Sequence, residues 1–403
     1  MDTASDQTTT SIPELSAALV DQLRRMGAIR TEPVAAALAA VRRDRFAPEA
    51  TPEMAYSNEA IVTKRDERGL AISSVSAPRV QAFMLEQAQV RPGMRLLEIG
   101  SGGVNAAYMS ELVGAGGQVT TVDIDQDVTD RARRLLAENG YEQVEVVLGD
   151  GEFGVPGRAP YDRIIVTVGS WDIPKAWTDQ LTEDGLIVLP LRMRSLNRSI
   201  ALRRDGDHLV SSSVERAGFV AMQGAGAFGE RLVQLQEDVA LRVDDGQPAD
   251  EELLAAALEH PLVETWSAVT VGDQEPFDDL DLFLASTSLG FCLLMAHESA
   301  VKAGVVKARP WGSSAVFSGG AFAYVVLRQL AADKHEFGVY GHGPDADRLV
   351  GHLAGQIREW DREHRGGPGP LICAYPADTP DDQLPEGLVI TKKHTKLTVS
   401  WSR

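Results

Sequence analysis

The sequence is poor in cysteine, with two among 403 residues, Cys292 and Cys373, each inside an apolar run. Such a pair gives neither a disulfide framework nor the close spacing of a zinc site, so we expect two buried thiols. Four histidines within residues 335–364 also fall on no metal-ligand spacing. The sequence therefore indicates no metal site.

Long hydrophobic runs are absent as well. No stretch of roughly eighteen uncharged apolar residues occurs, which excludes an ordinary membrane-spanning helix. The first eleven residues, MDTASDQTTTS, are polar and acidic and lack the basic and apolar regions of a signal peptide. We therefore expect a cytoplasmic protein that is not associated with membranes, and we expect residues 1–11 to be disordered.

Positive charge is scarce too: 39 lysines and arginines face 58 aspartates and glutamates, which gives a formal net charge of −19. Proteins that bind nucleic acids need a basic footprint, so this class is excluded. An acidic protein can still bind an anionic peptide through a local basic patch, and residues 391–403 form such a cluster. The alternative interpretation of this cluster is a solvated terminal strand.

The middle of the chain alternates between two kinds of hydrophobic pattern. Strands are expected at 94–100, 118–125, 144–151, 161–169 and 186–191. Helices are expected between them at 105–114, 127–140 and 174–185. This alternation predicts βαβ units and a doubly wound, Rossmann-like α/β sheet covered on both faces.

The regions on either side of this alternation are also patterned. Upstream, helices are expected at 12–27, 31–46 and 78–90, with an irregular polar segment before the last of them. Downstream, residues 199–215 and 218–224 suggest an antiparallel edge to the sheet. We interpret residues 12–229 as one domain.

Residues 230–403 are interpreted as a second, α+β domain. Helices are expected at 251–260, 280–297 and 345–365, and strands at 314–330, 370–376 and 387–401. The aromatic, glycine-rich strand pair at 310–326 is typical of a core hairpin, with a peptide-binding edge as the alternative.

A glycine-rich turn follows the first strand of the alternating region, in LLEIGSGG. The dinucleotide fingerprint GxGxxG would need glycines at 100, 102 and 105. Gly100 and Gly102 are present, but the third position is Asn105. By itself the turn is weak support for any nucleotide.

Carboxylates surround this turn. Glu98 precedes it, Asp123 ends the next strand at the spacing of a ribose-binding acid, and Asp150 with Gly151 follows the third strand. An acidic sheet edge suits a ligand with a cation, a ribose diol and no phosphate, and would repel a dinucleotide. The pattern therefore favours S-adenosylmethionine, while acidic helix caps are the alternative.

The motifs together resemble the protein L-isoaspartate O-methyltransferases over about residues 12–226, through AISSVSAPRV, LLEIGSGG, VTTVDID, VVLGDG and PYDRIIVTVGSW. The resemblance implies a class I methyltransferase fold and S-adenosyl-L-methionine as the methyl donor. In that family the serine of a Ser-Ala-Pro step lies against the donor and the substrate carboxylate, and Ser76 matches it. The resemblance also implies that Asp123 holds the ribose and Asp150 the adenine amine.

We therefore predict Ser76 as the catalytic residue, and Ser73 and Ser74 as structural. From the resemblance and the acidic edge, the predicted donor-binding residues are Val75, Ser76, Glu98, Gly100, Ser101, Gly102, Asn105, Asp123, Ile124, Asp150 and Gly151. Two departures from the family concern the turn, where Gly103-Val104 replaces the usual order, and Arg79, which stands where a histidine is frequent.

The reaction that the resemblance implies needs few catalytic groups. A carboxylate, with a pKa near ~4, is already the nucleophile at neutral pH, so its methylation needs no general base. Ser76 would orient one carboxylate oxygen in line with the methyl group. The ester formed can lose methanol to the next backbone amide nitrogen and close a succinimide.

The extra residues beyond the first domain bear on the substrate. The two-domain form resembles the FxLD-type methyltransferases of ribosomal peptide pathways, including lanthipeptides, graspetides and lasso peptides. That resemblance implies methylation of an aspartate or isoaspartate in a precursor or modified peptide, leading to aspartimide or isoaspartate, with the second domain binding the peptide. The alternatives are a general isoaspartate repair methyltransferase and a non-catalytic peptide-binding relative. The sequence leaves the oligomeric state open.

Overall fold

The computed structural model describes residues 10–244, 246–273, 275–310 and 312–402. Contacts divide the chain into two compact units. Unit 1 holds the described residues up to Leu191 together with Arg198–Phe228, and unit 2 holds Arg192–Asn197 and the described residues from Gly229 onward.

The predicted disorder of residues 1–11 falls outside the described residues except at positions 10 and 11. Ser11 is ordered and forms a capping box at the start of the first helix. Its backbone N–H and its hydroxyl donate to the Glu14 carboxylate at 2.9 and 2.8 Å. This exchange satisfies backbone donors that the first turn leaves free.

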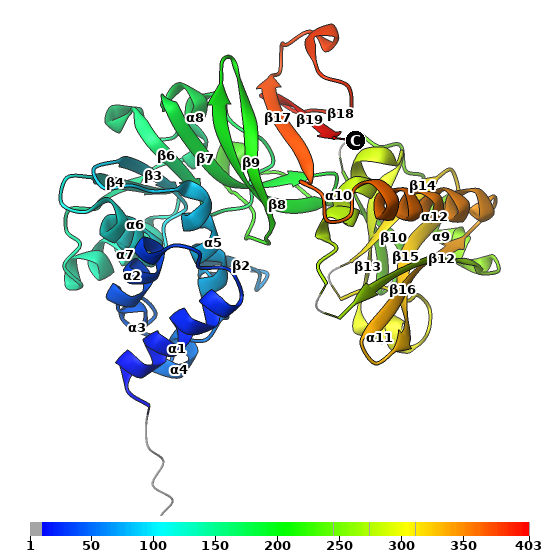
Figure 1. Cartoon of the computed structure of the whole chain (residues 1–403), viewed down its shortest axis with the longest axis horizontal. Helices are drawn as coiled ribbons and strands as arrows, with labels where there is room; N and C mark the ends of the chain where they lie inside the picture. The colour runs from blue at the N-terminus through cyan, green and yellow to red at the C-terminus, as the bar shows by residue number, and fades with distance from the viewer. Residues whose placement is uncertain (1–9, 245, 274, 311, 403) are drawn as a thin grey trace, which may run out of the picture. The chain divides into compact units, whose positions relative to one another are not determined.

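In unit 1 the chain first forms helices and a hairpin, and then a sheet with interspersed helices (Figure 1). The first part comprises α1 (Ile12–Arg25), α2 (Glu32–Ala40), α3 (Arg43–Phe46), α4 (Pro52–Ala55), β1 (Ile61–Arg65), β2 (Ala71–Val75) and α5 (Pro78–Ala88). The second part comprises β3 (Arg95–Ile99), α6 (Val104–Val113), β4 (Gln118–Asp123), α7 (Gln126–Glu138), β5 (Glu145–Leu148), β6 (Tyr161–Val166), α8 (Lys175–Asp179), β7 (Leu181–Met193), β8 (Leu196–Asp205) and β9 (His208–Arg216), with the 3-10 turns η1 (Gly151–Phe153), η2 (Pro156–Arg158) and η3 (Gly224–Gly226).

The strands of unit 1 follow the order β9-β8-β7-β6-β3-β4-β5. Parallel pairings join β7 to β6, β6 to β3, β3 to β4 and β4 to β5, while β8 and β9 are antiparallel. The predicted doubly wound α/β fold with an antiparallel edge is confirmed. The strand order reverses beside β3, and open α/β sheets bind ligands at the carboxyl ends of the strands at such a reversal.

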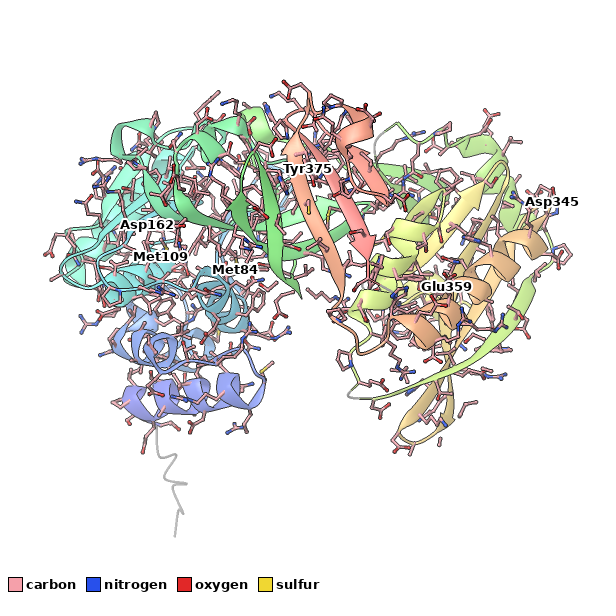
Figure 2. All side chains as sticks on the ribbon, turned by 45° about the horizontal axis from the view of Figure 1, so that its top comes forward. Met84, Met109, Asp162, Asp345, Glu359 and Tyr375 are labelled. Carbon is pink, nitrogen blue, oxygen red and sulfur yellow. The ribbon has the colours of Figure 1, made fainter. Side chains whose placement is uncertain are left out.

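The core of unit 1 lies between the sheet and the helices. Leu96 of β3 shares a buried hydrophobic cluster with Met84 of α5 and Met109 of α6, both labelled in Figure 2. Since strand residues alternate between faces, Ile99 points to the opposite side, where η1 packs against it. There Trp177 of α8 is fully buried and donates a 2.8 Å hydrogen bond to the first carbonyl of η1.

Two predicted helices of unit 1 are shorter than expected. The helix predicted over 31–46 breaks at Val41, whose backbone is extended, so that α2 and α3 are separate. The helix predicted over 174–185 ends at Asp179, because the following Leu181 is buried and already pairs with β6. In both places tertiary burial overrides a helical pattern.

Two further predictions in unit 1 are wrong. Residues 218–224 form no regular strand; they contribute an isolated bridge between Gly169 and Ala221. The polar segment before α5 is not wholly irregular, because it contains the antiparallel β1–β2 hairpin, in which Ile61 pairs with Val75.

Unit 2 is an α+β unit rich in strands, as predicted. One antiparallel sheet has the order β10-β11-β13-β14-β15-β16-β12, and a second group has the order β18-β19-β17. The strands are β10 (Arg231–Gln236), β11 (Val239–Val243), β12 (Val263–Gly272), β13 (Phe291–Ala296), β14 (Ser313–Ser318), β15 (Ala321–Ala331), β16 (Lys334–His342), β17 (Pro370–Pro376), β18 (Leu388–Thr391) and β19 (Thr395–Trp401). The helices are α9 (Glu251–Ala256), α10 (Asp278–Thr287), α11 (Glu298–Lys302) and α12 (Ala346–Glu363), with the 3-10 turns η4 (Ala257–Glu259) and η5 (Asp381–Gln383).

The helix predicted over 280–297 is only half correct. Its first part is α10, but after Gly290, with φ +67°, the chain continues as β13 between β11 and β14. Both halves are apolar, and a short apolar run does not by itself separate a buried helix from a buried strand. Cys292 on β13 and Cys373 on β17 are buried thiols that are not joined in a disulfide, as predicted.

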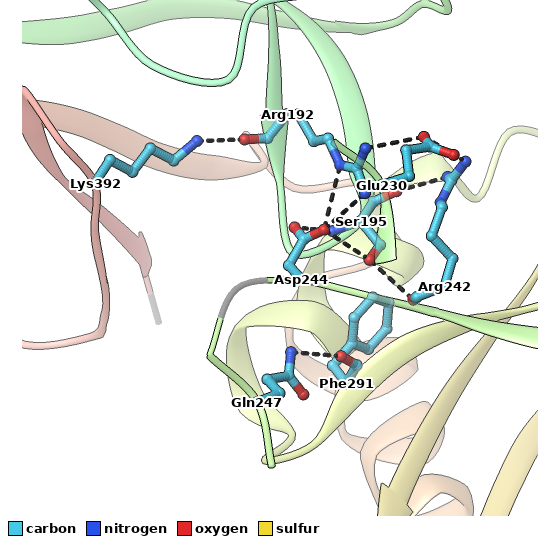
Figure 3. Close-up of polar contacts among 8 residues, drawn as sticks. All are labelled: Arg192, Ser195, Glu230, Arg242, Asp244, Gln247, Phe291 and Lys392. Atoms are coloured by element: carbon cyan, nitrogen blue, oxygen red, sulfur yellow. Dashed lines mark hydrogen bonds and ion pairs between the residues drawn. The ribbon is translucent and has the colours of Figure 1, made fainter. Parts of the chain in front are cut away.

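A tight turn between β7 and β8 is fixed by a polar cluster of unit 2 (Figure 3). Arg194 and Ser195 have φ of +50° and +64°, the two positive values of a two-residue hairpin turn that usually needs Asn-Gly. Asp244 accepts hydrogen bonds from both the backbone N–H and the hydroxyl of Ser195. Asp244 is itself paired with Arg192 at 2.9 Å. This buried carboxylate therefore stabilises a turn whose positive φ angles are unfavourable for Arg194 and Ser195.

Two lysines of the predicted basic cluster are engaged by other groups of the protein. Lys392 is buried and donates to the backbone carbonyl of Arg192, and Lys396 pairs with Asp381 at 2.6 Å. None of the described helices combines the length and the apolar character that crossing a bilayer requires.

Candidate active site

The glycine-rich turn lies at the carboxyl end of β3. Gly100 has φ +94°, and a Cβ atom there would lie 2.7 Å from Thr167 Oγ1 and 2.9 Å from Val168 Cγ1. Gly103, with φ +83°, begins α6 and packs against the Phe46 ring. Only glycine adopts these positive φ angles and also leaves room for the neighbouring atoms. The glycine at 103, where the order of the turn differs from that usual in the family, therefore fits the turn that this chain makes.

Asp123 connects this turn to the end of the neighbouring strand β4. One carboxylate oxygen accepts a 2.9 Å hydrogen bond from the Ser101 backbone N–H, and the other accepts one of 2.9 Å from the Asp125 backbone N–H. Burial raises the pKa of the Asp123 carboxyl, while the two backbone donors act in the opposite direction. The carboxylate thus fixes two loops at one sheet edge.

A pocket opens at this edge, at the reversal of strand order. Its wall is formed by Ile72, Ile99, Gly100, Val122, Asp123, Ile124, Asp125, Val128, Gly151, Val168, Ala221, Met222 and Gln223. Of the predicted donor-binding residues, Gly100, Asp123, Ile124 and Gly151 line it. The other predicted residues lie around it and are placed as follows.

Glu98 and Asn105 lie behind the turn, away from the pocket wall. Glu98 is fully buried and accepts hydrogen bonds from the Thr121 hydroxyl at 2.6 Å and the Asn105 amide at 2.9 Å. Burial raises the pKa of Glu98 to about 7. These contacts join β3, β4 and α6, so the two residues support the turn from within the core.

Asp150 and Gly151 stand where β5 leads into η1. The Asp150 carboxylate accepts from the Glu152 backbone N–H at 3.0 Å and from the Ala225 backbone N–H at 2.8 Å. Gly151 approaches Ile99 so closely that a Cβ atom would lie 2.5 Å from its Cγ2. Asp150 therefore anchors the segment that carries Met222 into the pocket wall. The predicted contact of Asp150 with adenine stays a prediction.

Val75 and Ser76 link β2 to α5. Val75 is buried, Ser76 is half-buried, and neither lines the pocket. The Ser76 backbone carbonyl accepts a 2.7 Å hydrogen bond from Arg43, whose guanidinium is buried and also donates to Gln81 of α5. Ser76 is thus held at the junction of β2 and α5, and its catalytic role stays a prediction.

Other predicted residues take simpler places. Ser101 is buried, and no described atom bonds its hydroxyl. Gly102 faces β2, since a Cβ atom there would lie 3.6 Å from the Ser74 carbonyl oxygen. Ser73 accepts a 3.0 Å hydrogen bond from the Thr63 hydroxyl within the hairpin, a contact in keeping with the structural role that we predict for it.

Several residues of the pocket wall are not among the residues that the sequence predicts for the site. Asp125 was within reach, because it is the second carboxylate of the motif VTTVDID. Ile72 belongs to a segment that we took for irregular. Met222 and Gln223 stand far from the other motifs in sequence, and long-range contacts such as the bridge between Gly169 and Ala221 bring them to the pocket.

The wall fits the nucleoside part of S-adenosylmethionine. Asp123 and Asp125 offer carboxylate oxygens of the kind that accept from a ribose diol, and no lysine or arginine is among the lining residues to take a phosphate. Ile124, Val128 and Met222 offer apolar contact for a base. Glycines at 100 and 151 let the backbone approach closely, and the unbonded Ser101 hydroxyl adds a polar group beside the turn.

The sequence around this pocket is similar to that of known proteins. Residues 14–226 match the family model described as Protein-L-isoaspartate(D-aspartate) O-methyltransferase (PCMT). The protein-L-isoaspartate O-methyltransferase of Methanopyrus kandleri is 39% identical over 180 residues, which cover 44% of this chain and 77% of that protein. That of Ignicoccus hospitalis is 38% identical over 174 residues, 43% of this chain and 80% of its own. A solved protein-L-isoaspartate O-methyltransferase aligns with 86% of this chain and 92% of its own, at 23% identity and a TM-score of 0.49.

Proposed function

The chain belongs to the protein-L-isoaspartate(D-aspartate) O-methyltransferase family, and from this premise we propose that it methylates the free carboxylate of isoaspartyl residues in peptides or proteins. It is an enzyme with a class I methyltransferase fold, and S-adenosyl-L-methionine is its methyl donor. The observation that carries the proposal is that every residue of the pocket wall, from Ile72 to Gln223, falls within the matched residues 14–226.

The residues of unit 1 divide the work between donor and acceptor. S-adenosylmethionine supplies an electrophilic methyl group when it is bound. Asp123 and Asp125 would hold its ribose, and Ile124 and Met222 its base, so that the glycine turn faces its charged end. Ser76, on the segment that continues from the wall residue Ile72, would orient one oxygen of the substrate carboxylate.

The chain needs no general base for this reaction. The substrate carboxylate is ionised at neutral pH, and its oxygen forms the new bond to the methyl carbon as the bond from that carbon to sulfur breaks. The ester then loses methanol to the following backbone amide nitrogen, which closes a succinimide. Hydrolysis of the succinimide returns aspartate or isoaspartate, which is how repeated methylation would repair a damaged residue.

Tailoring of a ribosomally made peptide, our first interpretation of the sequence, becomes the second candidate. The relatives are named for isoaspartate, and these names support the repair reaction. One observation keeps the second candidate: the family match ends at residue 226, and the main segment of unit 2, from Gly229 onward, lies beyond it. Peptide recognition by unit 2 and a cytoplasmic location stay predictions.

A comparison of two matched peptides tests the proposal. One hexapeptide carries isoaspartate and its twin carries aspartate at the same position, and transfer of labelled methyl from S-adenosylmethionine is measured for both. We expect kcat/KM to be about a hundredfold higher for the isoaspartyl peptide, because a misplaced carboxylate loses in-line geometry. Equal rates for the two peptides, or transfer only to a precursor peptide encoded beside this gene, would favour the second candidate.

A further inference from the structure

The β1–β2 hairpin lies against the donor pocket although it is not part of the main sheet. Its strands pair only with each other among the described residues. Ile72 on β2 lines the pocket, and the Ser74 carbonyl faces Gly102 of the glycine turn. The hairpin therefore closes one side of the pocket.

Lys64 on β1 connects this hairpin to Asp125, another residue of the pocket wall. Its ammonium group donates to the two carboxylate oxygens of Asp125 at 2.8 and 2.7 Å, and to Asp127 at 2.8 Å. The Lys64 side chain is 32% exposed and that of Asp125 17%, while Asp127 is 81% exposed. The inner pair is thus shielded from water more than the outer one.

Asp125 is part of the donor site in its own right. It lines the pocket, and its side chain caps α7 by accepting from the backbone N–H groups of Asp127 and Val128. Its backbone N–H donates to Asp123. Lys64 therefore bonds to the loop whose carboxylates face the donor, and it neutralises charge where acidic residues crowd one helix start.

The same hairpin leads directly to the acceptor side. Lys64 on β1 pairs with Ser73 on β2, and Ser76 follows the end of β2. A shift of the hairpin would move the pocket wall at Ile72 and the position of Ser76 together.

We propose that Lys64 is a positioning residue for methyl transfer: by pairing with Asp125 and Asp127 it holds the hairpin so that the donor pocket and Ser76 keep one relative arrangement. This inference rests on the proposed function, because it takes the pocket to be the donor site. Lys64 does not act on the reacting atoms. It acts through Ile72, Asp125 and Ser76.

Lys64→Met tests this role, with Lys64→Arg as the variant that keeps the charge. Lys175→Met is the matched control, since Lys175 is also in unit 1 and forms an ion pair, with Asp179, away from the pocket. The probe is S-adenosylhomocysteine, which carries no sulfonium charge, and its Kd is measured by calorimetry at low and high salt. Turnover of the isoaspartyl hexapeptide is measured at saturating donor, and thermal unfolding reports the fold.

We expect Lys64→Met to raise the Kd of S-adenosylhomocysteine about twofold to fivefold at low salt, the range of a partly exposed ion pair. High salt should weaken binding to the wild type toward that of Lys64→Met and change the variant little. The kcat at saturating donor should fall about tenfold, because Ser76 is displaced. Lys64→Arg should restore both values to within about twofold, and Lys175→Met should match the wild type.

Two different failures can be told apart. If the wild type binds no S-adenosylhomocysteine, the proposed function fails first. If the wild type binds it and Lys64→Met has the same Kd, salt response and kcat, Lys64 has no positioning role. A loss of thermal stability in Lys64→Met without any change in these three values would also overturn the inference.

Discussion

At the scale of single residues, the site depends on side chains whose surroundings fix their roles. Ser76 is held through its backbone carbonyl by Arg43, so its side chain is not needed to shape the turn. Ser73, on the preceding strand β2, is engaged by Thr63. Ser76 therefore stays the residue that we predict to meet the substrate carboxylate.

Ser76→Ala should lower kcat/KM for the isoaspartyl peptide by about tenfold to a hundredfold, because the carboxylate loses its orienting hydrogen bond. The Kd of S-adenosylhomocysteine should stay within about twofold, since Ser76 does not line the pocket. Steady-state kinetics and calorimetry measure the two effects. Ser74→Ala, on the preceding strand β2, is the control, and equal turnover in both variants would remove Ser76 from the mechanism.

Glu98 gives a prediction about pH. Its pKa in the folded protein is raised to about 7 from 4.5 by burial, so between these values the folded protein keeps a proton that the unfolded chain releases. The free energy of unfolding should therefore fall as the pH rises from 4.5 to 7 and level off above 7, with a contribution from Glu98 of about 3 kcal/mol.

Glu98→Gln removes this titration and keeps hydrogen-bonding groups for Thr121 and Asn105. Urea unfolding of the variant and the wild type at about pH 5 and about pH 8 measures the effect. The variant should gain stability relative to the wild type as the pH rises. A difference between the two proteins that does not change with pH would contradict the assignment.

The sequence predicts the positions of some of these residues at the pocket but not of others. Asp123 and Gly100 were predicted at the pocket because strand-end carboxylates and turn glycines have local signals. Glu98 is predicted at the donor, but its alternation with Leu97 and Ile99 decides which face it takes, and only the packing of α6 shows that this face is buried. Met222 has no local signal, since long-range contacts of its segment with Gly169 and Asp150 bring it to the pocket.

At the scale of elements, α5 and the Ser-Ala-Pro turn are held by one buried arginine. Arg43 on α3 donates to the Ala55 carbonyl at 2.7 Å, to the Gln81 side chain at 2.6 Å and to the Ser76 carbonyl at 2.7 Å. Its planar guanidinium meets three acceptors from three segments at once. A short helix of four residues thereby fixes where a longer one begins.

Arg43→Lys should lower the free energy of unfolding by about 2–4 kcal/mol and reduce kcat, because an ammonium group cannot reach all three acceptors and leaves some of them buried and unpaired. Chemical unfolding and steady-state kinetics check both effects. Arg45→Lys is the control, since Arg45 lies on the same short helix and is exposed. Wild-type stability in Arg43→Lys would show that the three contacts do not hold the turn.

Elements with an uninterrupted pattern were predicted well, and those decided by tertiary pairing were not. The long amphipathic helix α12 and the strands β3 to β6 follow from periodicity alone. The β1–β2 hairpin was missed because its polar strands carry no apolar alternation, and β13 was taken for helix because it continues the apolar run of α10. In both cases the partner strand determines the structure.

At the scale of the whole molecule, the two units differ in how far their roles are known. The family match covers unit 1 and ends at residue 226, and the pocket lies wholly within it. Unit 2 has its own hydrophobic core, formed between strands such as β11 and β15 and the segments packed on them. Its hydrophobic pattern predicts an α+β unit, but no local motif in it indicates a substrate, so peptide recognition by unit 2 stays a prediction.

The proposed reaction of this chain is esterification of an isoaspartyl carboxylate with the methyl group of S-adenosylmethionine. The most direct measurement follows the intact mass of one isoaspartyl peptide over time, after mixing with the protein and the donor. We expect the peptide to gain one methyl group and then to lose methanol as the succinimide forms. A peptide mass that stays unchanged while the protein binds the donor would contradict this expectation.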